Sequence, residues 1–207
     1  MGSEVEPDEF RVEWPSPGEL LFTDLLPDGR NNACLNFSAD FWTGYAGGYR
    51  KGGRILTNWV IEQGCDHDYL VYPIVFLYSH HLELSMKEVI RKGEQLLGHG
   101  EGFKPGHDLS KQWMHCRQVI EQVFPGEAPE VLQAIGEQVS ELTALDARLT
   151  AFRYPYEKDG ETPTLPPEFR RFNLRHFAGR MERIADALDG ACSAIEAALE
   201  MRAEFSG

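Results

Sequence analysis

The stretch LRHFAGRMERIADALDGACSAIEAAL, residues 174–199, decides the fold class of this chain. Its apolar residues recur every three or four positions, which is the spacing of one face of an α-helix. They are Leu174, Phe177, Met181, Ile184, Leu188, Ala191, Ile195 and Leu199. The pattern predicts a long amphipathic helix whose apolar face must be covered by other helices.

Four further segments carry helical patterns. In the segment that starts at Asp68 and ends near Gly93, apolar residues occur on every side, so we expect a central, buried helix. The other segments begin near Ser38, near Asp108 and at Pro129. No alternation of strands and helices is visible. The sequence therefore predicts an all-α fold, an antiparallel up-and-down bundle of four to five helices.

The length of 207 residues is that of one compact domain. Residues 1–33 are rich in acidic residues, proline and glycine, with only short apolar pieces. This composition predicts an irregular N-terminal arm over 1–33, followed by a helical bundle domain over 34–207.

Charge and cysteine usage narrow the class of protein. Lys and Arg total 20 against 33 Asp and Glu, and the net charge of −13 opposes non-specific binding to nucleic acid or anionic membrane. The four cysteines form no metal-binding pair, so we expect free thiols, no metal and no cofactor. The longest apolar run, 69–78, contains Pro73 and is far shorter than the ~20 residues of a membrane span. We expect a soluble, cytoplasmic protein without membrane contact.

Glycine repeats every four residues in the first predicted helix, at Gly44, Gly48 and Gly52. Each glycine inside a helix costs about 1 kcal/mol relative to alanine. A compensating contact is therefore expected, and we predict close packing of this glycine stripe against another helix.

Polar side chains form one stripe on the central helix. His80, Glu83 and Lys87 follow each other at steps of three and four residues. Because a buried charge is costly unless it is paired, we expect Glu83 to be buried and to pair with Lys87, His107 or Arg153. The stripe is either a structural network or the wall of a functional cleft, in which these groups exchange protons and bind an anion.

Two segments outside this helix carry further candidates. His107 precedes Asp108, which can cap the next helix, so the imidazole either locks the loop or lies at the mouth of the cleft. In Phe152-Arg153-Tyr154-Pro155, two aromatic residues flank an arginine in a segment that we expect to be extended. Arg153 either pairs with Glu83 or makes a bidentate contact with a phosphate group.

Arginines gather at the start of the last helix, around His176. They are Arg170, Arg171, Arg175, Arg180 and Arg183. One interpretation is an ordinary solvated helix face. The other is phosphate recognition, since planar guanidinium groups suit phosphate, and Arg171 with His176 could then stabilise and protonate an RNA phosphate during cleavage by a 2′-hydroxyl.

Several of these strings together resemble the HEPN group of helical proteins. The string YPIVFLYSHHLELSMKEVI, residues 72–90, followed by GHDL, residues 106–109, looks like the core helix pair of that group. FRYP, residues 152–155, followed by KDG, residues 158–160, is similar to strings in uncharacterised prokaryotic members. The resemblance covers roughly residues 38–200.

The resemblance implies a helical bundle, frequent homodimers, and roles in toxin–antitoxin and phage-defence systems. Many members are ribonucleases with an arginine four to six residues before a histidine, a spacing that Arg171 or Arg170 with His176 fits. The residue after Arg171 is Phe172, where catalytic members usually carry a polar residue. Non-catalytic members bind nucleotides or partner proteins.

Two hypotheses follow from the sequence. In the first, the chain is a non-catalytic or conditionally active HEPN-like module of a defence or toxin–antitoxin system. It forms a homodimer and engages a protein partner encoded nearby, together with a nucleotide or RNA. In the second, it is a metal-independent ribonuclease in which Arg171 and His176 act on RNA. In the first hypothesis the acidic arm and a face of the bundle engage the protein partner, and in the second His80, Glu83, Lys87 and Arg153 shape the pocket. The candidate binding residues are His80, Glu83, Lys87, His107, Arg153, Arg170 and Arg175.

Overall fold

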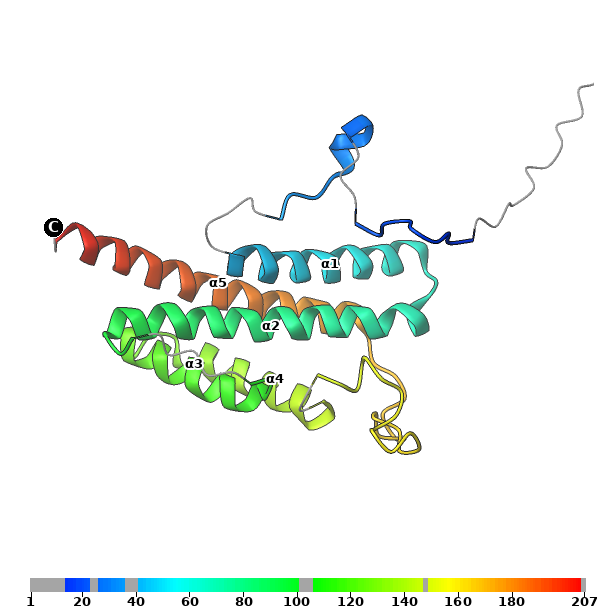
Figure 1. The fold of residues 1–207 in the computed structure, drawn as a ribbon. Coiled ribbons are helices and arrows are strands. Elements are labelled where there is room, and N and C mark those ends of the chain that lie inside the picture. Colours follow the sequence, from blue (N-terminus) through cyan, green and yellow to red (C-terminus); the bar gives the residue numbers. More distant parts are fainter. Residues whose placement is uncertain (1–13, 23–25, 36–40, 101–105, 147–148, 206–207) are drawn as a thin grey trace, which may run out of the picture. The chain divides into compact units, whose positions relative to one another are not determined.

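The structure is a computed structural model that describes residues 14–22, 26–35, 41–100, 106–146 and 149–205. The chain divides into two compact units, Met1–Ala39 and Asp40–Gly207. The first unit contains a short 3₁₀-helix, η1, Leu26–Asn31. The second contains five α-helices (Figure 1), which are α1 Phe41–Gln63, α2 His67–Leu97, α3 Leu109–Val123, α4 Pro129–Leu145 and α5 Leu174–Glu204. The expected helix start near Ser38 lies outside the described residues.

The predicted all-α bundle is confirmed. Within the described residues, the β-structure is limited to one isolated bridge between Tyr156 and Pro163. Helix α2 is central and packs against α1, α3 and α5 (Figure 1). Its burial follows from its composition, because apolar side chains such as Ile74, Leu82 and Met86 lie on several of its faces, and each is at most 2% exposed.

The helices do not all alternate in direction. Helix α1 is antiparallel to α2, because Thr43 meets Glu88 and the later Gly53 lies against the earlier Tyr78. Helix α3 runs parallel to α2, because Glu83 meets His107 just before α3 and Glu94 meets His115 further along. Helix α5 is also parallel to α2, because Phe177 lies beside Tyr78 and Glu196 binds Lys92 further along both helices. The parallel course of α3 matters for the site, since it brings the start of α3 to the middle of α2.

The glycine stripe of α1 does not make the close contact with another helix that the repeat predicted. A Cβ atom at Gly48 would have no neighbour within 4 Å, and one at Gly52 would make only ordinary contact with Leu77. The close approach is at the adjacent Gly53, where a Cβ would lie 2.9 Å from Cδ2 of Tyr78. Gly53 faces α2, whereas Gly48 lies on the exposed side of α1.

The segment between α4 and α5 differs from the extended conformation expected for 151–155. Residues 151–153 form a turn, in which the carbonyl oxygen of Thr150 accepts hydrogen bonds from the amides of Arg153 and Tyr154, both at 3.0 Å. Pro155 restricts its own backbone and that of Tyr154, which both follow residues 151–153, so it does not prevent this turn. The predicted turn at 158–160 is present, with Asp159 accepting hydrogen bonds from the amides of Glu161 and Thr162.

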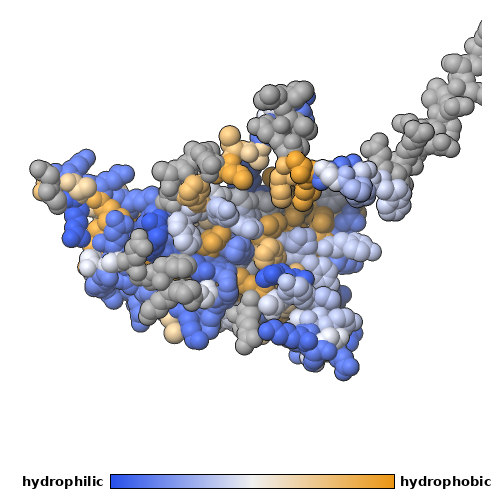
Figure 2. Space-filling view, in the orientation of Figure 1, coloured by the Kyte–Doolittle hydropathy of each residue, from blue (hydrophilic) through white to orange (hydrophobic). Residues whose placement is uncertain are grey.

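Hydrophilic residues cover much of the helical surface in the view of Figure 2, with hydrophobic patches between them. Among the described helices, none is long and apolar enough to cross a membrane.

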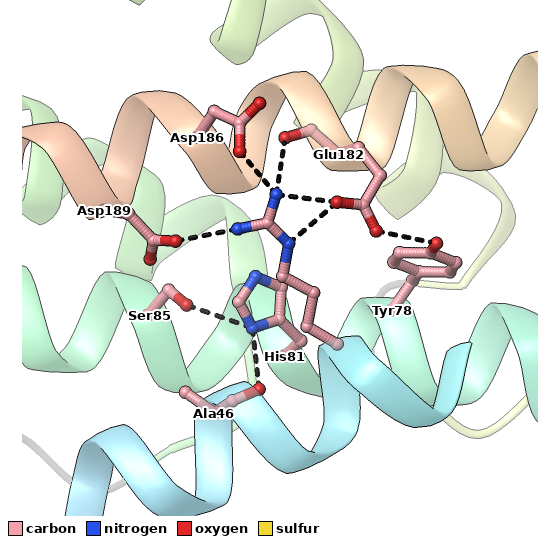
Figure 3. Close-up of polar contacts among 8 residues, drawn as sticks. Ala46, Tyr78, His81, Ser85, Glu182, Asp186 and Asp189 are labelled. Atoms are coloured by element: carbon pink, nitrogen blue, oxygen red, sulfur yellow. Dashed lines mark hydrogen bonds and ion pairs between the residues drawn. The ribbon is translucent and has the colours of Figure 1, made fainter. Parts of the chain in front are cut away.

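An arginine from α1 joins three helices (Figure 3). Arg50 binds Glu182 at 2.6 Å, Asp186 at 2.5 Å and Asp189 at 2.7 Å, all on α5. The hydroxyl of Tyr78, on α2, donates to the second oxygen of Glu182 at 2.9 Å. This network fixes α1, α2 and α5 to one another around a shared carboxylate.

Candidate functional site

The candidate site is built around Glu83, in the middle of α2. Its side chain is 1% exposed and accepts three hydrogen bonds. Lys87 Nζ donates to Oε1 at 2.5 Å, His107 Nδ1 lies 2.8 Å from the same oxygen, and His80 Nδ1 lies 3.3 Å from Oε2. The expectation that Glu83 is buried and paired is confirmed, and the structure brings together four predicted site residues.

Glu83 is a carboxylate at neutral pH despite its burial. Burial alone would raise its pKa, but hydrogen bonds from His80 and Lys87 outweigh that effect and lower the pKa to about 2. An ionised carboxylate can only accept hydrogen bonds, so each histidine donates from Nδ1. The Nε2 atoms of both rings then carry a lone pair when the imidazole is neutral, and neither has a partner among the described residues.

Local sequence explains how these groups meet. Glu83 is three residues after His80 and four before Lys87, so the three side chains lie on one face of α2. His107 is placed by the start of α3, where Asp108 accepts a hydrogen bond from the amide of Lys111 at 3.1 Å. This capping interaction was expected from the sequence, and it holds His107 next to the helix end.

Aromatic rings form one wall of the site. The imidazole of His80 stacks on Phe76 at 5.7 Å between ring centroids, and Tyr49 meets it edge-on at 4.4 Å. Arg153 lies over Phe76, with Cζ 5.4 Å from the ring centroid, and also over Tyr154 at 5.1 Å. Arg153 is therefore held by π-systems and does not pair with Glu83.

A pocket of about 870 Å³ opens beside these groups. Its lining residues are Phe76, His80, Glu83, His107, Asp108, Leu149, Thr150, Arg153 and Lys158. The two acidic groups are balanced, because Glu83 pairs with Lys87 and Asp108 pairs with Lys111 at 3.2 Å. Arg153 and Lys158 have no carboxylate partner among the described residues. The pocket thus presents two uncompensated cations in a chain with a net charge of −13.

The second predicted pair, Arg171 and His176, does not line one shared pocket. Arg170 and Arg171 line a pocket beside His67 at the start of α2, whereas His176 lines a different pocket between α4 and α5. Both members of the pair are exposed, as is Arg175. No ion pair within the described residues involves these arginines.

A partly buried cluster between α2 and α5 was missed by sequence reasoning. Lys92 Nζ donates to Glu88 at 2.6 Å, to Glu196, and to the sulfur of Cys192 at 3.4 Å. The two carboxylates and the thiol lie close enough together to bind a metal ion, but the ammonium group of Lys92 already supplies the positive charge between them. Burial raises the pKa of Cys192 to about 11, which keeps this thiol protonated.

Comparisons with known proteins identify no relative of this chain. No protein family, no curated protein and no solved structure matches the chain. The fold and site define the chain as an all-helical protein with a cationic, aromatic-walled pocket over a buried carboxylate.

Proposed function

We propose that this chain is a HEPN-like helical module that binds a phosphate-bearing ligand in the pocket over Glu83. The observation that carries the proposal is the pair of uncompensated cations, Arg153 and Lys158, which face the same pocket as two imidazoles. One N–H of Arg153 donates to the hydroxyl of Tyr154 at 3.2 Å, and the remaining N–H groups of its planar guanidinium can match a phosphate. The Nε2 atoms of both imidazoles have no partner among the described residues, so they can form hydrogen bonds with a phosphate.

The resemblance to HEPN proteins supplies the biological setting of the proposal. The strings that carry it contribute His80, Glu83 and Lys87, then His107, and then Arg153. Three segments distant in sequence therefore supply one pocket, which supports a shared role for them. On this basis we propose a role in a prokaryotic toxin–antitoxin or defence system, with a protein partner encoded nearby.

The same proposal includes a homodimer. Four large apolar side chains of α1, Phe41, Tyr45, Ile55 and Trp59, are 41–63% exposed. Their spacing puts them on one face of the helix. Exposed apolar patches of this kind mark interaction surfaces, and a second copy of the chain is the occupant that the resemblance suggests. Light scattering of the purified protein measures its mass and tests this directly.

Ligand binding is tested by calorimetric titration of the full chain with pyrophosphate. Arg153→Ala and Lys158→Ala should each weaken binding about tenfold, because each removes a charged hydrogen-bond donor. Lys51→Ala is the matched control, since Lys51 is exposed on α1 and its loss changes the net charge equally. If the wild type does not bind pyrophosphate, or the control weakens binding as much, the proposal is wrong.

The alternative function is a metal-independent ribonuclease that uses Arg171 and His176. Its support is that both side chains are exposed, with no ion pair within the described residues to occupy them. His176→Ala should then abolish RNA cleavage and leave the melting temperature unchanged. Intact RNA after incubation with the wild type, with and without divalent metal, would contradict this function and leave the binding module as the better explanation.

A further inference from the structure

The pocket between α4 and α5 shares no lining residue with the Glu83 pocket. Helix α4 packs against α3, whereas α5 packs against α1 and α2, and the pocket occupies the space that this arrangement leaves between α4 and α5. Its volume is about 170 Å³. Much of its lining is apolar and includes Val75, Leu142, Phe152, Met181 and Ile184. A ligand in this pocket would be independent of the phosphate ligand proposed above.

Phenylalanine rings form one wall of this pocket. Phe169 stacks on Phe172 at 5.6 Å between ring centroids, and Phe172 meets Phe177 edge-on at the same distance. Local sequence explains the second contact. Asn173 caps α5 by accepting a hydrogen bond from the amide of His176 at 2.8 Å. Phe172 directly precedes the cap and Phe177 lies one turn after it, which are the two positions of a hydrophobic staple. The wall is therefore fixed before any ligand binds.

One polar group in the lining lacks a partner. The side-chain oxygen of Gln138, on α4, is buried and has no hydrogen-bond partner among the described residues. A buried acceptor without a donor is unfavourable, so a ligand that donates a hydrogen bond there would remove this cost. The charged side chains of Glu141 and Arg180 also line the pocket, but both residues are exposed and lie at its open side. The interior thus offers apolar contact and one acceptor.

The size of the pocket limits its ligand to about one aromatic ring. A cavity of about 150 Å³ lined by leucine, isoleucine and phenylalanine binds benzene. Aromatic rings pack favourably edge-on or offset against other aromatic rings, and a hydroxyl group on the ring can donate a hydrogen bond. We propose that this pocket binds a small phenol, with the ring packed against Phe172, Phe177 and Met181 and the hydroxyl donating to Gln138. The inference goes beyond the proposed function, because it concerns a different pocket.

The experiment compares the binding of p-cresol and p-xylene to the full chain by calorimetric titration. The two compounds have nearly the same shape, but one carries a hydroxyl where the other carries a methyl group. In the wild type, p-cresol should bind at least as tightly as p-xylene, because the hydrogen bond to Gln138 offsets the loss of water from the hydroxyl. Gln138→Met keeps the length of the side chain and removes the acceptor. This variant should shift the preference about fivefold towards p-xylene, since a hydrogen bond between neutral groups contributes about that factor.

The matched control is Gln133→Met, at an exposed position of α4 outside the pocket lining, and it should leave the preference unchanged. Methyl NMR spectra of the wild type locate the ligand without any substitution. p-Cresol should shift the methyl signals of Leu142 and Met181, which line the pocket, and leave that of Met114, which is 60% exposed on α3.

Three results would overturn the inference. The first is the absence of p-cresol binding by the wild type, which would fit a pocket that holds only water. The second is the same preference in wild type and Gln138→Met. The third is p-cresol binding that leaves the signals of Leu142 and Met181 in place. None of these results bears on the phosphate pocket, which the titration with pyrophosphate tests separately.

Discussion

The Nδ1 atom of His107 lies 2.8 Å from Oε1 of Glu83, although 24 residues separate them in the sequence. This contact joins the start of α3 to the middle of α2, and Lys87 reaches the same oxygen from the next turn of α2. A single buried carboxylate thereby fixes two helices and orients the imidazoles of the pocket. The packing of these two helices and the orientation of both imidazoles therefore depend on one residue.

Glu83→Ala should lower the free energy of unfolding by about 3–5 kcal/mol. The substitution removes the carboxylate that Lys87, His80 and His107 share, and breaking a buried charge pair costs about this much. Chemical denaturation monitored by circular dichroism measures the change. Glu62→Ala, at an exposed position of α1, should stay within about 0.5 kcal/mol of the wild type. Equal stability of the two variants would contradict the role of Glu83.

The lowered pKa of Glu83 makes part of the stability depend on pH. In the folded protein the pKa is about 2, against an ordinary value of 4.5. The ionised carboxylate therefore stabilises the fold above about pH 4.5, and this contribution, on the order of 3 kcal/mol, is lost as the pH falls towards 2. Denaturation curves between pH 2 and 7 should converge for wild type and Glu83→Gln at low pH. Curves that stay parallel would show that Glu83 does not contribute.

Most of the groups around the Glu83 carboxylate could be predicted from the sequence, and the reason is physical. Partners on the same helix are fixed by the helical repeat, so His80 and Lys87 could be placed beside Glu83 without a structure. His107 could be proposed because a buried carboxylate requires partners and the helix after it starts at Asp108. The conformation of Arg153 was less predictable, since the turn at Thr150 depends on Asp146 and on the positive φ of Leu149.

The networks of Arg50 and Lys92 were missed because most of their partners are distant in sequence. Arg50 binds side chains 132 to 139 residues away, and Lys92 binds Glu196 across 104 residues. On helices, such charges look like ordinary solvated positions until the packing is known. The parallel course of α3 beside α2 was missed for a similar reason. No local sequence pattern determines the direction in which a helix runs after the preceding loop.

Alanine substitutions at two glycines of α1 should change the stability of the fold in opposite directions. Gly53→Ala should destabilise the fold by about 1–3 kcal/mol, because its Cβ would press on the ring of Tyr78, which is held by Glu182. Gly48→Ala meets open space and should stabilise the helix by up to about 1 kcal/mol. Thermal unfolding of both variants measures the difference. A stabilising Gly53→Ala would show that Tyr78 can move, contrary to the packing described.

Arg50→Ala should lower the free energy of unfolding by about 2–4 kcal/mol, which is more than an exposed ion pair contributes. The arginine side chain is only 17% exposed, and its removal leaves Glu182, Asp186 and Asp189 close together on α5 without their shared cation. Arg50→Lys should recover only part of the loss, because one ammonium group cannot reproduce the several N–H directions of a guanidinium.

Chemical denaturation at low and high salt measures both effects. The loss in Arg50→Ala should shrink with added salt, since screening weakens the repulsion between the three carboxylates. Lys51→Ala, at the neighbouring exposed position, should change stability by less than about 0.5 kcal/mol, and an equal effect in both alanine variants would contradict the network.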